Sequence, residues 1–491
     1  MPSTTRKGSS VGLVPGVGSE ANMPTRWLAP ALVVALTAGL TAATVRADLT
    51  RYRALETGWS WDLAYYNQWC WSLTRGDGTL SVRPVASYAI EGPRALKMNY
   101  LAPIRFALLP LYRIWPDPRL LLIVNAGVFW WLVPACYGLA VAESGSRRVG
   151  LVAASLSALT PLAWPLAVDD FRELQLAVPF VIWGVRGFRE RSRSYAILGV
   201  VGMLACRQEL AVAVCLLAIV PPRRPEDLGK TYAWSRVAIL VGVGWLLLFL
   251  VYLKVVVGPM AGRVYLDEMA AGGPSTRQVA ETSAELLAVG LGSWALLAFG
   301  VPRLGLIVAP WVYSVANGRW AAAFLATEQW QQVRYTAPMV ATSLAAGVVG
   351  YARVTARLRG RWANWAFHIA LIAGLVAPTA IVQSRLARVS RPFPAADVDA
   401  FWAHVPRVGP GDGVLAAYEL SAPLSSRRIL SSYVLEMNRP KGFPRLEESY
   451  RWVFIKTGDF GPQIFTDQGF ARVHDGHSIR IYHRFGPAKS P

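Results

Sequence analysis

Asp62 is the first residue whose type and position suggest chemistry. It is the one acid in the aromatic-rich stretch 59–69, which follows the first long apolar run of the chain. A carboxylate that is partly removed from water at such a place can accept a proton from a hydroxyl near neutral pH. An Asp at the start of an amphipathic helix is also a common N-cap, so the residue alone leaves a catalytic and a capping role open.

A second group of charges forms a short turn between two apolar runs. Its sequence, Asp169-Asp170-Phe171-Arg172-Glu173, holds three acids and an arginine. Paired acids can bind a divalent metal or divide the work of a general acid and a general base. Asp170 and Glu173 are therefore candidate catalytic residues, and a divalent metal is possible here. A solvated turn that caps the next helix is the simpler interpretation.

Two further places carry charge beside apolar runs. Arg207 and Glu209 interrupt the apolar stretch 195–221, and ionisable groups at membrane depth normally mark a site or a pathway. The two side chains could instead neutralise each other. Arg334, followed by Tyr335, lies at the mouth of a late apolar run. An arginine there can bind phosphate bidentately, or it can extend its side chain to the membrane interface.

The elements that must position these residues are long apolar runs. Of the 491 residues, 54% are hydrophobic and 16% are charged, which excludes a disordered chain, a fibrous rod and an ordinary soluble enzyme. We therefore predict a mainly α fold, a polytopic transmembrane bundle of about eleven helices, in which the short runs between 174 and 221 can be broken helices. The runs are 27–45, 119–142, 149–168, 174–186, 195–206, 209–221, 236–257, 284–300, 301–317, 335–352 and 363–382.

The net charge of +20 follows from the predicted topology. Lys and Arg are concentrated in alternate loops, as is typical of cytoplasmic loops, so a nucleic-acid partner is not needed to explain the charge. The same bias places the N-terminus in the cytoplasm of a plasma-membrane protein. We predict a cytoplasmic tail at 1–26, a transmembrane domain at 27–382 with a large outer loop at 46–118, and a small extracytoplasmic α/β domain at 383–491.

The C-terminal segment and the absence of several motifs further restrict the class of protein that this sequence can encode. Short β-type runs at 414–418, 428–433 and 452–456 predict strands, with turns at 409–411 and 439–442. The four cysteines lack metal-ligand spacing, and the chain has no nucleotide-binding loop, zinc-protease motif or serine-hydrolase elbow. All candidate residues fall on the outer side of the predicted topology. Their carboxylates and arginines suit an anionic, lipid-linked substrate at the membrane surface.

Several stretches resemble the DUF2079 family of multi-pass membrane proteins, which is grouped with the GT-C glycosyltransferase-like superfamily. The resemblance covers about residues 50–350, with a looser match in the C-terminal domain. The stretches are Trp61-Asp62-Leu63-Ala64-Tyr65-Tyr66-Asn67-Gln68, Asn99-Tyr100-Leu101-Ala102-Pro103-Ile104, Asp170-Phe171-Arg172-Glu173, Arg207-Gln208-Glu209 and Arg334-Tyr335.

The resemblance implies a glycosyltransferase of the cell envelope. GT-C enzymes usually carry their catalytic base in the first outer loop, so Asp62 would activate a hydroxyl of a glycan or protein acceptor. The donor would be a polyprenyl-phosphate-linked sugar, drawn from the surrounding membrane lipid. Arginines would neutralise its phosphate, and neighbouring polar side chains would contact the substrate. The residues that this assignment includes are Arg172, Arg207, Glu209, Arg334, Tyr335, Asn99 and Gln68.

The chain departs from the family pattern at several polar positions. Asn99, Arg172 and Arg334 stand where relatives carry histidines, and Asn67 stands in place of a second acid. A metal or proton-transfer role of those histidines would be absent here. Two alternatives therefore stay open. One is a transporter or flippase-like protein with its site at Arg207 and Glu209. The other is a non-catalytic member that scaffolds envelope enzymes.

Overall fold

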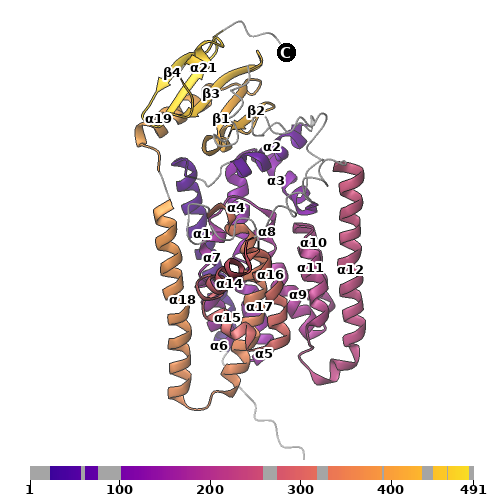
Figure 1. Cartoon of the computed structure of the whole chain (residues 1–491). Helices are drawn as coiled ribbons and strands as arrows, with labels where there is room; N and C mark the ends of the chain where they lie inside the picture. The colour runs from indigo at the N-terminus through magenta and orange to yellow at the C-terminus, as the bar shows by residue number, and fades with distance from the viewer. Residues whose placement is uncertain are drawn as a thin grey trace, which may run out of the picture.

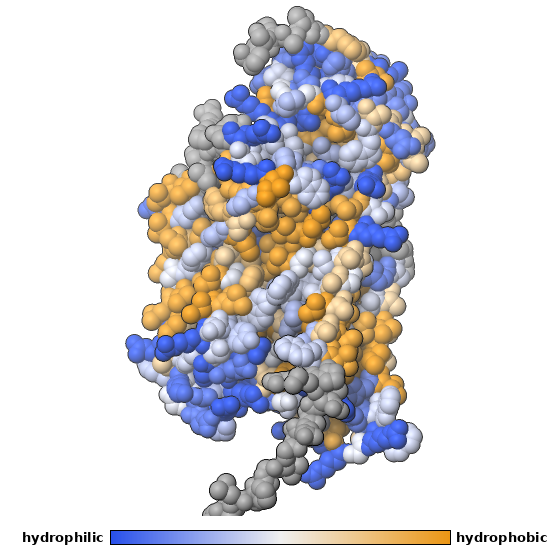
Figure 2. Space-filling model, turned by 180° about the vertical axis from the view of Figure 1, so that it is seen from behind, coloured by the Kyte–Doolittle hydropathy of each residue, from blue (hydrophilic) through white to orange (hydrophobic). Residues whose placement is uncertain are grey.

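The computed structural model describes residues 23–56, 61–75, 101–257, 274–317, 330–389, 392–433, 446–461 and 463–485. Its helices form a bundle, and a small sheet-containing domain covers one end of that bundle (Figure 1). On the face that Figure 2 shows, hydrophobic residues form a broad band across the bundle, with hydrophilic residues at both ends. This is the surface expected of a protein whose middle part faces lipid rather than water.

Among the residues that the structure describes, five helical segments are long and apolar enough to cross a membrane. A sixth crossing is possible if the bent pair Thr276–Leu291 and Ser293–Phe299 counts as one span. Each predicted apolar run is helical over at least part of its length, but the prediction of about eleven crossings exceeds these five or six. The five segments contain α1 (Met23–Arg53), α4 (Pro118–Phe129) with α5 (Leu132–Ser144), α12 (Thr231–Tyr252), α17 (Ala337–Arg357) and α18 (Arg361–Val389).

The remaining apolar runs form helices that are short or broken. α10 ends at Cys206 and α11 begins at Leu210, so the charged residues between them interrupt what would otherwise be one helix. Gly292 makes the 108° bend of the other pair, since its φ of +56° is unfavourable for a residue with a side chain. These helices are α6 (Arg147–Ala158), α7 (Ala163–Ala167), α8 (Glu173–Leu176), α9 (Val178–Glu190), α10 (Arg193–Cys206), α11 (Leu210–Leu216), α14 (Thr276–Glu285), α15 (Ser293–Phe299) and α16 (Pro302–Ala316).

The helices differ in how much of their surface the bundle covers. The most apolar part of α17 is 78% buried, so α17 lies at the centre. The corresponding parts of α1, α12 and α18 are only 11% to 17% buried, and α12 and α18 flank the bundle on opposite sides (Figure 1). Because these outer helices expose large apolar side chains, both aliphatic and aromatic, they suit contact with lipid.

The loops before α12 and before α18 lie at the end of the bundle away from the sheet domain (Figure 1), and both contain arginine residues. The end of α9 meets the first of these loops, where the backbone N–H of Arg223 donates to the carbonyl of Arg189 at 2.7 Å. Arg191 donates to Thr231 at 3.0 Å in the same region. The last residue of α1, Arg53, lies at the opposite end, where its carbonyl accepts a hydrogen bond from Trp402 of the C-terminal domain at 2.8 Å.

The C-terminal domain is a five-stranded mixed sheet in the order β2-β1-β3-β5-β4. Helix α19 (Ala395–His404) packs on it through Phe401, whose ring lies 5.5 Å from that of Phe454. β1 pairs in parallel with β2 and β3, whereas β5 pairs antiparallel with β3 and β4. The strands are β1 (Gly413–Ala417), β2 (Leu430–Tyr433), β3 (Tyr450–Lys456), β4 (Ala471–Asp475) and β5 (Ile479–His483).

The first three strands confirm the predicted β-type runs within a residue or two at each end. β4 and β5 were not predicted, although Ile479, Arg480 and Ile481 alternate as residues of a half-buried strand do. The turn expected at 439–442 lies outside the described residues.

Candidate functional site

Asp62 lies at the junction of the bundle and the C-terminal domain. It is the second residue of α2 (Trp61–Arg75), and only 4% of its surface is exposed. Its Oδ2 atom forms ion pairs with Nη2 of Arg172 and with Nη1 of Arg334, the latter at 3.0 Å. The structure thus places one buried carboxylate between two guanidinium groups that come from distant parts of the chain.

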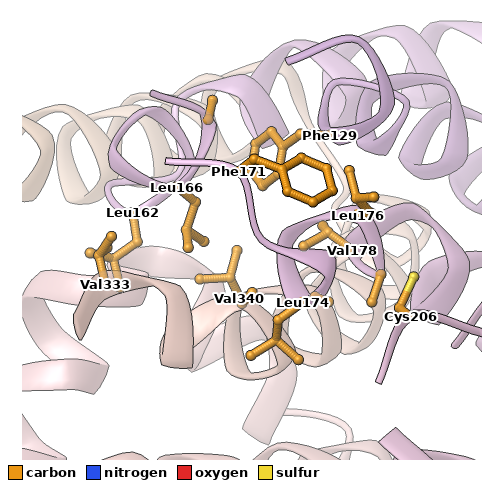
Figure 3. Close-up of a cluster of buried hydrophobic side chains, with 14 of the residues drawn as sticks. Phe129, Leu162, Leu166, Phe171, Leu174, Leu176, Val178, Cys206, Val333 and Val340 are labelled. Atoms are coloured by element: carbon orange, nitrogen blue, oxygen red, sulfur yellow. The ribbon is translucent and has the colours of Figure 1, made fainter. Parts of the chain in front are cut away.

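The local fold explains why Arg172 faces Asp62. Residue 172 is extended, with φ −146° and ψ 140°, immediately before α8. Its neighbours Phe171 and Leu174 are buried in the apolar cluster drawn in Figure 3, which also contains Phe129 and Val340. Successive side chains of an extended segment point to opposite sides, so burial of Phe171 directs Arg172 away from this cluster.

Arg334 reaches the same carboxylate from the turn η7 (Trp330–Thr336), which leads into α17. The Nε atoms of Arg172 and Arg334 are buried and have no hydrogen-bond partner among the described residues. Buried N–H donors are normally satisfied, and guanidinium groups bind phosphate well. The pair therefore has the unsatisfied donors and the positive charge that an anionic ligand would use.

Glu173 belongs to a second buried network beside the first. Its Oε1 atom forms an ion pair with Arg105, and its Oε2 atom accepts a hydrogen bond from Tyr66 at 2.8 Å. Burial would raise the pKa of Glu173, but the charges of Arg105 and Arg207 outweigh it and hold the pKa below its usual value. Because both carboxylate oxygens are engaged, the described geometry gives Glu173 the character of an anchor rather than a free base.

The ring of Tyr66 links the two networks. The guanidinium carbons of Arg105 and Arg172 lie 5.1 Å and 5.5 Å from its centroid, and the ring of Phe171 lies 5.3 Å away. Arg105 is in the turn η1 (Pro103–Leu108), and neither it nor Tyr66 was singled out from the sequence. The feature of the sequence that could have indicated Arg105 is that it is the one charged residue in the apolar stretch 101–112.

Arg207 and Glu209 form the ion pair that the sequence left open as an alternative. Nε of Arg207 lies 2.9 Å from Oε1 of Glu209, and the Glu209 side chain is 30% exposed. The adjacent Gln208 accepts a hydrogen bond from the backbone N–H of Leu101 at 3.1 Å. The positive charge of Arg207 also acts on Glu173 and Arg172, so the break between α10 and α11 belongs to the same cluster.

Asp169 and Asp170 lie within the influence of Arg334. Burial raises the pKa of Asp170 to about 6, and the charges of Arg51 and Arg334 partly oppose this rise. Burial, followed by the charge of Asp170, raises the pKa of Asp169 to about 7. Asp169 accepts a hydrogen bond from Gln175 at 3.2 Å, but it is only half-buried, so a stability prediction is better based on Asp170.

We expect Asp170 to make the folded protein less stable as pH rises from about 4 to about 6. Its pKa in the folded state lies above the usual value of 3.8, so between about pH 4 and pH 6 the folded state keeps a proton that the unfolded state has lost. The free energy of unfolding therefore decreases as pH rises through this window, and the decrease is complete above about pH 6. Thermal unfolding at several pH values should show this component in the wild type and not in Asp170→Asn. The exposed Asp399→Asn is the matched control, and equal pH slopes for the wild type and Asp170→Asn would refute the assignment.

The remaining predicted site residues do not share one location. Gln68 is buried on a different face of α2 and donates to the backbone of the C-terminal domain. Tyr335 is 37% exposed beside Arg334, whose guanidinium carbon lies 5.1 Å from its ring centroid. Asn99 falls outside the described residues. Among the residues that the structure describes, no group of three or more His, Cys, Asp or Glu side chains could hold a metal ion.

The fold defines a class of protein, the multi-pass helical membrane proteins with a small C-terminal α/β domain. The fold is similar to that of a crystal structure of ArnT from Cupriavidus metallidurans bound to undecaprenyl phosphate, with a TM-score of 0.50. The two chains are 12% identical, and the match covers 95% of this chain and 99% of ArnT. The apo structure of the same ArnT matches with a TM-score of 0.45 and 12% identity, over 86% of this chain and 92% of the other.

The chain belongs to the family described as "Predicted membrane protein (DUF2079)", whose model matches residues 51–477. No curated protein matches the chain. The resemblance inferred from short stretches is thereby confirmed, and the family match extends further into the C-terminal domain than those stretches did.

Proposed function

We propose that this protein is a membrane glycosyltransferase of the GT-C type, which transfers a sugar from a polyprenyl-phosphate donor to an acceptor outside the cytoplasm. The observation that carries the proposal is the buried Asp62 carboxylate between Arg172 and Arg334, each with an unpartnered Nε atom. The undecaprenyl phosphate bound by the structurally similar ArnT supports the choice of lipid.

In the proposed reaction, Asp62 is the general base. The acceptor hydroxyl gives its proton to the Asp62 carboxylate while its oxygen forms a bond to the anomeric carbon of the sugar. The bond from that carbon to the donor phosphate breaks, and the polyprenyl phosphate leaves with the electron pair. Attack opposite to the leaving group inverts the anomeric carbon. Arg172, Arg334 and the nearby Arg207 would stabilise the negative charge that develops on the leaving phosphate.

The ion pairs seen around Asp62 fit a resting state of this site. Both arginines pair with the Oδ2 atom of the Asp62 carboxylate, so the lone pairs of this oxygen are engaged. A phosphate that binds the same guanidinium groups would compete with Asp62 for them. Donor binding would therefore release the base when the leaving group is in place.

The orientation in the membrane is part of the proposal. The loops before α12 and before α18, which contain arginine residues, lie at the end of the bundle opposite the C-terminal domain (Figure 1), and loops rich in Lys and Arg normally stay in the cytoplasm. This bias favours a cytoplasmic N-terminus, and the C-terminal domain and Asp62 would then lie outside. The site would then open at the outer surface, where an acceptor glycan or protein is available.

Binding of undecaprenyl phosphate to the purified full-length protein tests the proposal. Removal of Arg172 deletes a charged hydrogen-bond donor, so we expect Arg172→Ala to weaken binding about tenfold or more. Arg119 is the matched control, because it pairs with Asp117 outside the Asp62 cluster. Equal weakening in Arg119→Ala, or none in Arg172→Ala, would contradict the assigned phosphate site.

The broken helix at Arg207 favours one alternative, a transporter or flippase-like protein. Sites of such proteins often lie where a membrane helix is interrupted, and Arg207 is buried at the break between α10 and α11. Lipid translocation in proteoliposomes that persists in Asp62→Asn but is lost in Arg207→Ala would support this alternative over transfer chemistry.

A further inference from the structure

Helix α2 presents different residues to the two parts of the protein. Asp62 and Tyr66 are four residues apart, so they share one face, and both join the charged cluster. Each residue advances a helix by about 100°, which places Asn67 and Gln68 about 140° and about 240° around the axis from Asp62. Asn67 and Gln68 thus lie on either side of the direction opposite the proposed base.

Asn67 is fully buried against the C-terminal domain. Its Nδ2 atom donates to the hydroxyls of Ser425 at 2.8 Å and Ser426 at 3.0 Å. Its Oδ1 atom accepts a hydrogen bond from Tyr112 of α3 (Leu109–Ile114) at 2.6 Å. The amide therefore uses both N–H groups and its oxygen to join α2, α3 and the segment between β1 and β2.

Gln68 extends the same contact to the backbone. Its Nε2 atom donates to the carbonyls of Arg427 at 2.9 Å and Arg428 at 3.3 Å. The segment that receives these bonds is itself fixed, since Ser425 donates to the carbonyl of Ala422 at 2.6 Å and Arg427 donates to that of Gly409 at 3.1 Å. α2 is thus fastened to a part of the C-terminal domain that has its own internal support.

We propose that Asn67 and Gln68 are positioning residues through which the C-terminal domain holds α2, and with it the Asp62 carboxylate, against Arg172 and Arg334. This inference rests on the proposed function, in which Asp62 is the base. A short helix that is held on one side by the bundle and on the other by the domain keeps its angle only while both contacts persist. A displacement of about 1 Å at the base is enough to slow a reaction strongly.

A second contact between the same two parts supplies a control. Trp402 of α19 donates to the carbonyl of Arg53 at the end of α1, at 2.8 Å, and does not involve α2. Trp402→Phe therefore loosens the C-terminal domain without touching the contact proposed to act on Asp62. A general effect of domain loosening would appear equally in this variant and in Asn67→Ala.

Hydrogen exchange of the full-length protein in lipid nanodiscs tests the positioning role. We expect the amides of α2 to exchange about tenfold faster in Asn67→Ala and to remain near the wild-type rate in Trp402→Phe. Ser425→Ala removes a partner from the other side and should change exchange in the same direction, which keeps the test valid if Asn67→Ala folds poorly. Unchanged exchange of α2, or an equal rise in Trp402→Phe, would overturn the inference.

The kinetic result separates this inference from the proposed function. If Asn67 positions the base, kcat for sugar transfer falls about tenfold in Asn67→Ala while KM for the lipid-linked donor is unchanged. Faster exchange of α2 with an unchanged kcat would refute the positioning role. Absence of transfer by the wild type would refute the proposed function instead, and the exchange measurements would still decide whether the domain holds α2.

Discussion

Replacing Asp62 with asparagine is expected to lower the rate of sugar transfer by about 10²- to 10⁴-fold. General-base catalysis contributes factors of this size, and an amide of nearly the same shape cannot take the proton of the acceptor hydroxyl. The measurement is the initial rate of labelled-sugar transfer from a polyprenyl-phosphate donor by the purified protein. Equal rates for the wild type and Asp62→Asn would exclude the proposed mechanism.

The same variant should bind undecaprenyl phosphate more tightly than the wild type does. Loss of the carboxylate leaves Arg172 and Arg334 without their common counter-ion, so a phosphate no longer competes with Asp62 for them. A simple loss of folding would weaken binding together with transfer. Opposite changes in transfer and binding are therefore the signature of a base that shares its arginines with the donor phosphate.

Arg105→Ala is expected to lower the free energy of unfolding by about 3–5 kcal/mol, because it removes one member of a buried ion pair. Glu173 has no exposed surface, and it would keep its charge next to the Tyr66 ring without its nearest cation. A denaturant titration of the protein in mild detergent, under conditions where unfolding is reversible, measures this loss of unfolding free energy.

Two comparisons make the Arg105 result specific. Replacing both partners, as Arg105→Met with Glu173→Leu, should recover much of the loss, since no uncompensated charge remains buried. Arg277→Ala breaks an exposed pair with Glu281 and should change stability by at most about 0.5 kcal/mol. A similar small effect for Arg105→Ala would show that Glu173 does not depend on this pair.

The helical part of the fold is largely predictable because apolar runs are frequent and several of them are long enough to span a bilayer. The number of spans is less predictable, since hydropathy alone does not show every break in a helix. The charges of Arg207 and Glu209 mark the interruption between Cys206 and Leu210 in the sequence, whereas the bend at Gly292 was not predicted. In the C-terminal domain, the apolar first three strands were predicted, whereas the polar edge strand β4 was not.

The sequence predicts the members of the charged cluster better than it predicts their roles. Asp62 and Arg334 are 272 residues apart, and nothing in their local sequences indicates that they meet. Glu173 is an acid in an acidic turn, but its role depends on Arg105, which reaches it from another segment. Gln68 is a polar residue in the same helix as Asp62, yet its place on the helix surface directs it to the C-terminal domain.

The most direct test of the central claim is a structure of the full-length protein with undecaprenyl phosphate bound in lipid nanodiscs. The proposed function predicts the phosphate within hydrogen-bond distance of both Arg172 and Arg334, with Asp62 released from at least one of them. A phosphate bound away from these arginines, with the Asp62 ion pairs intact, would contradict it.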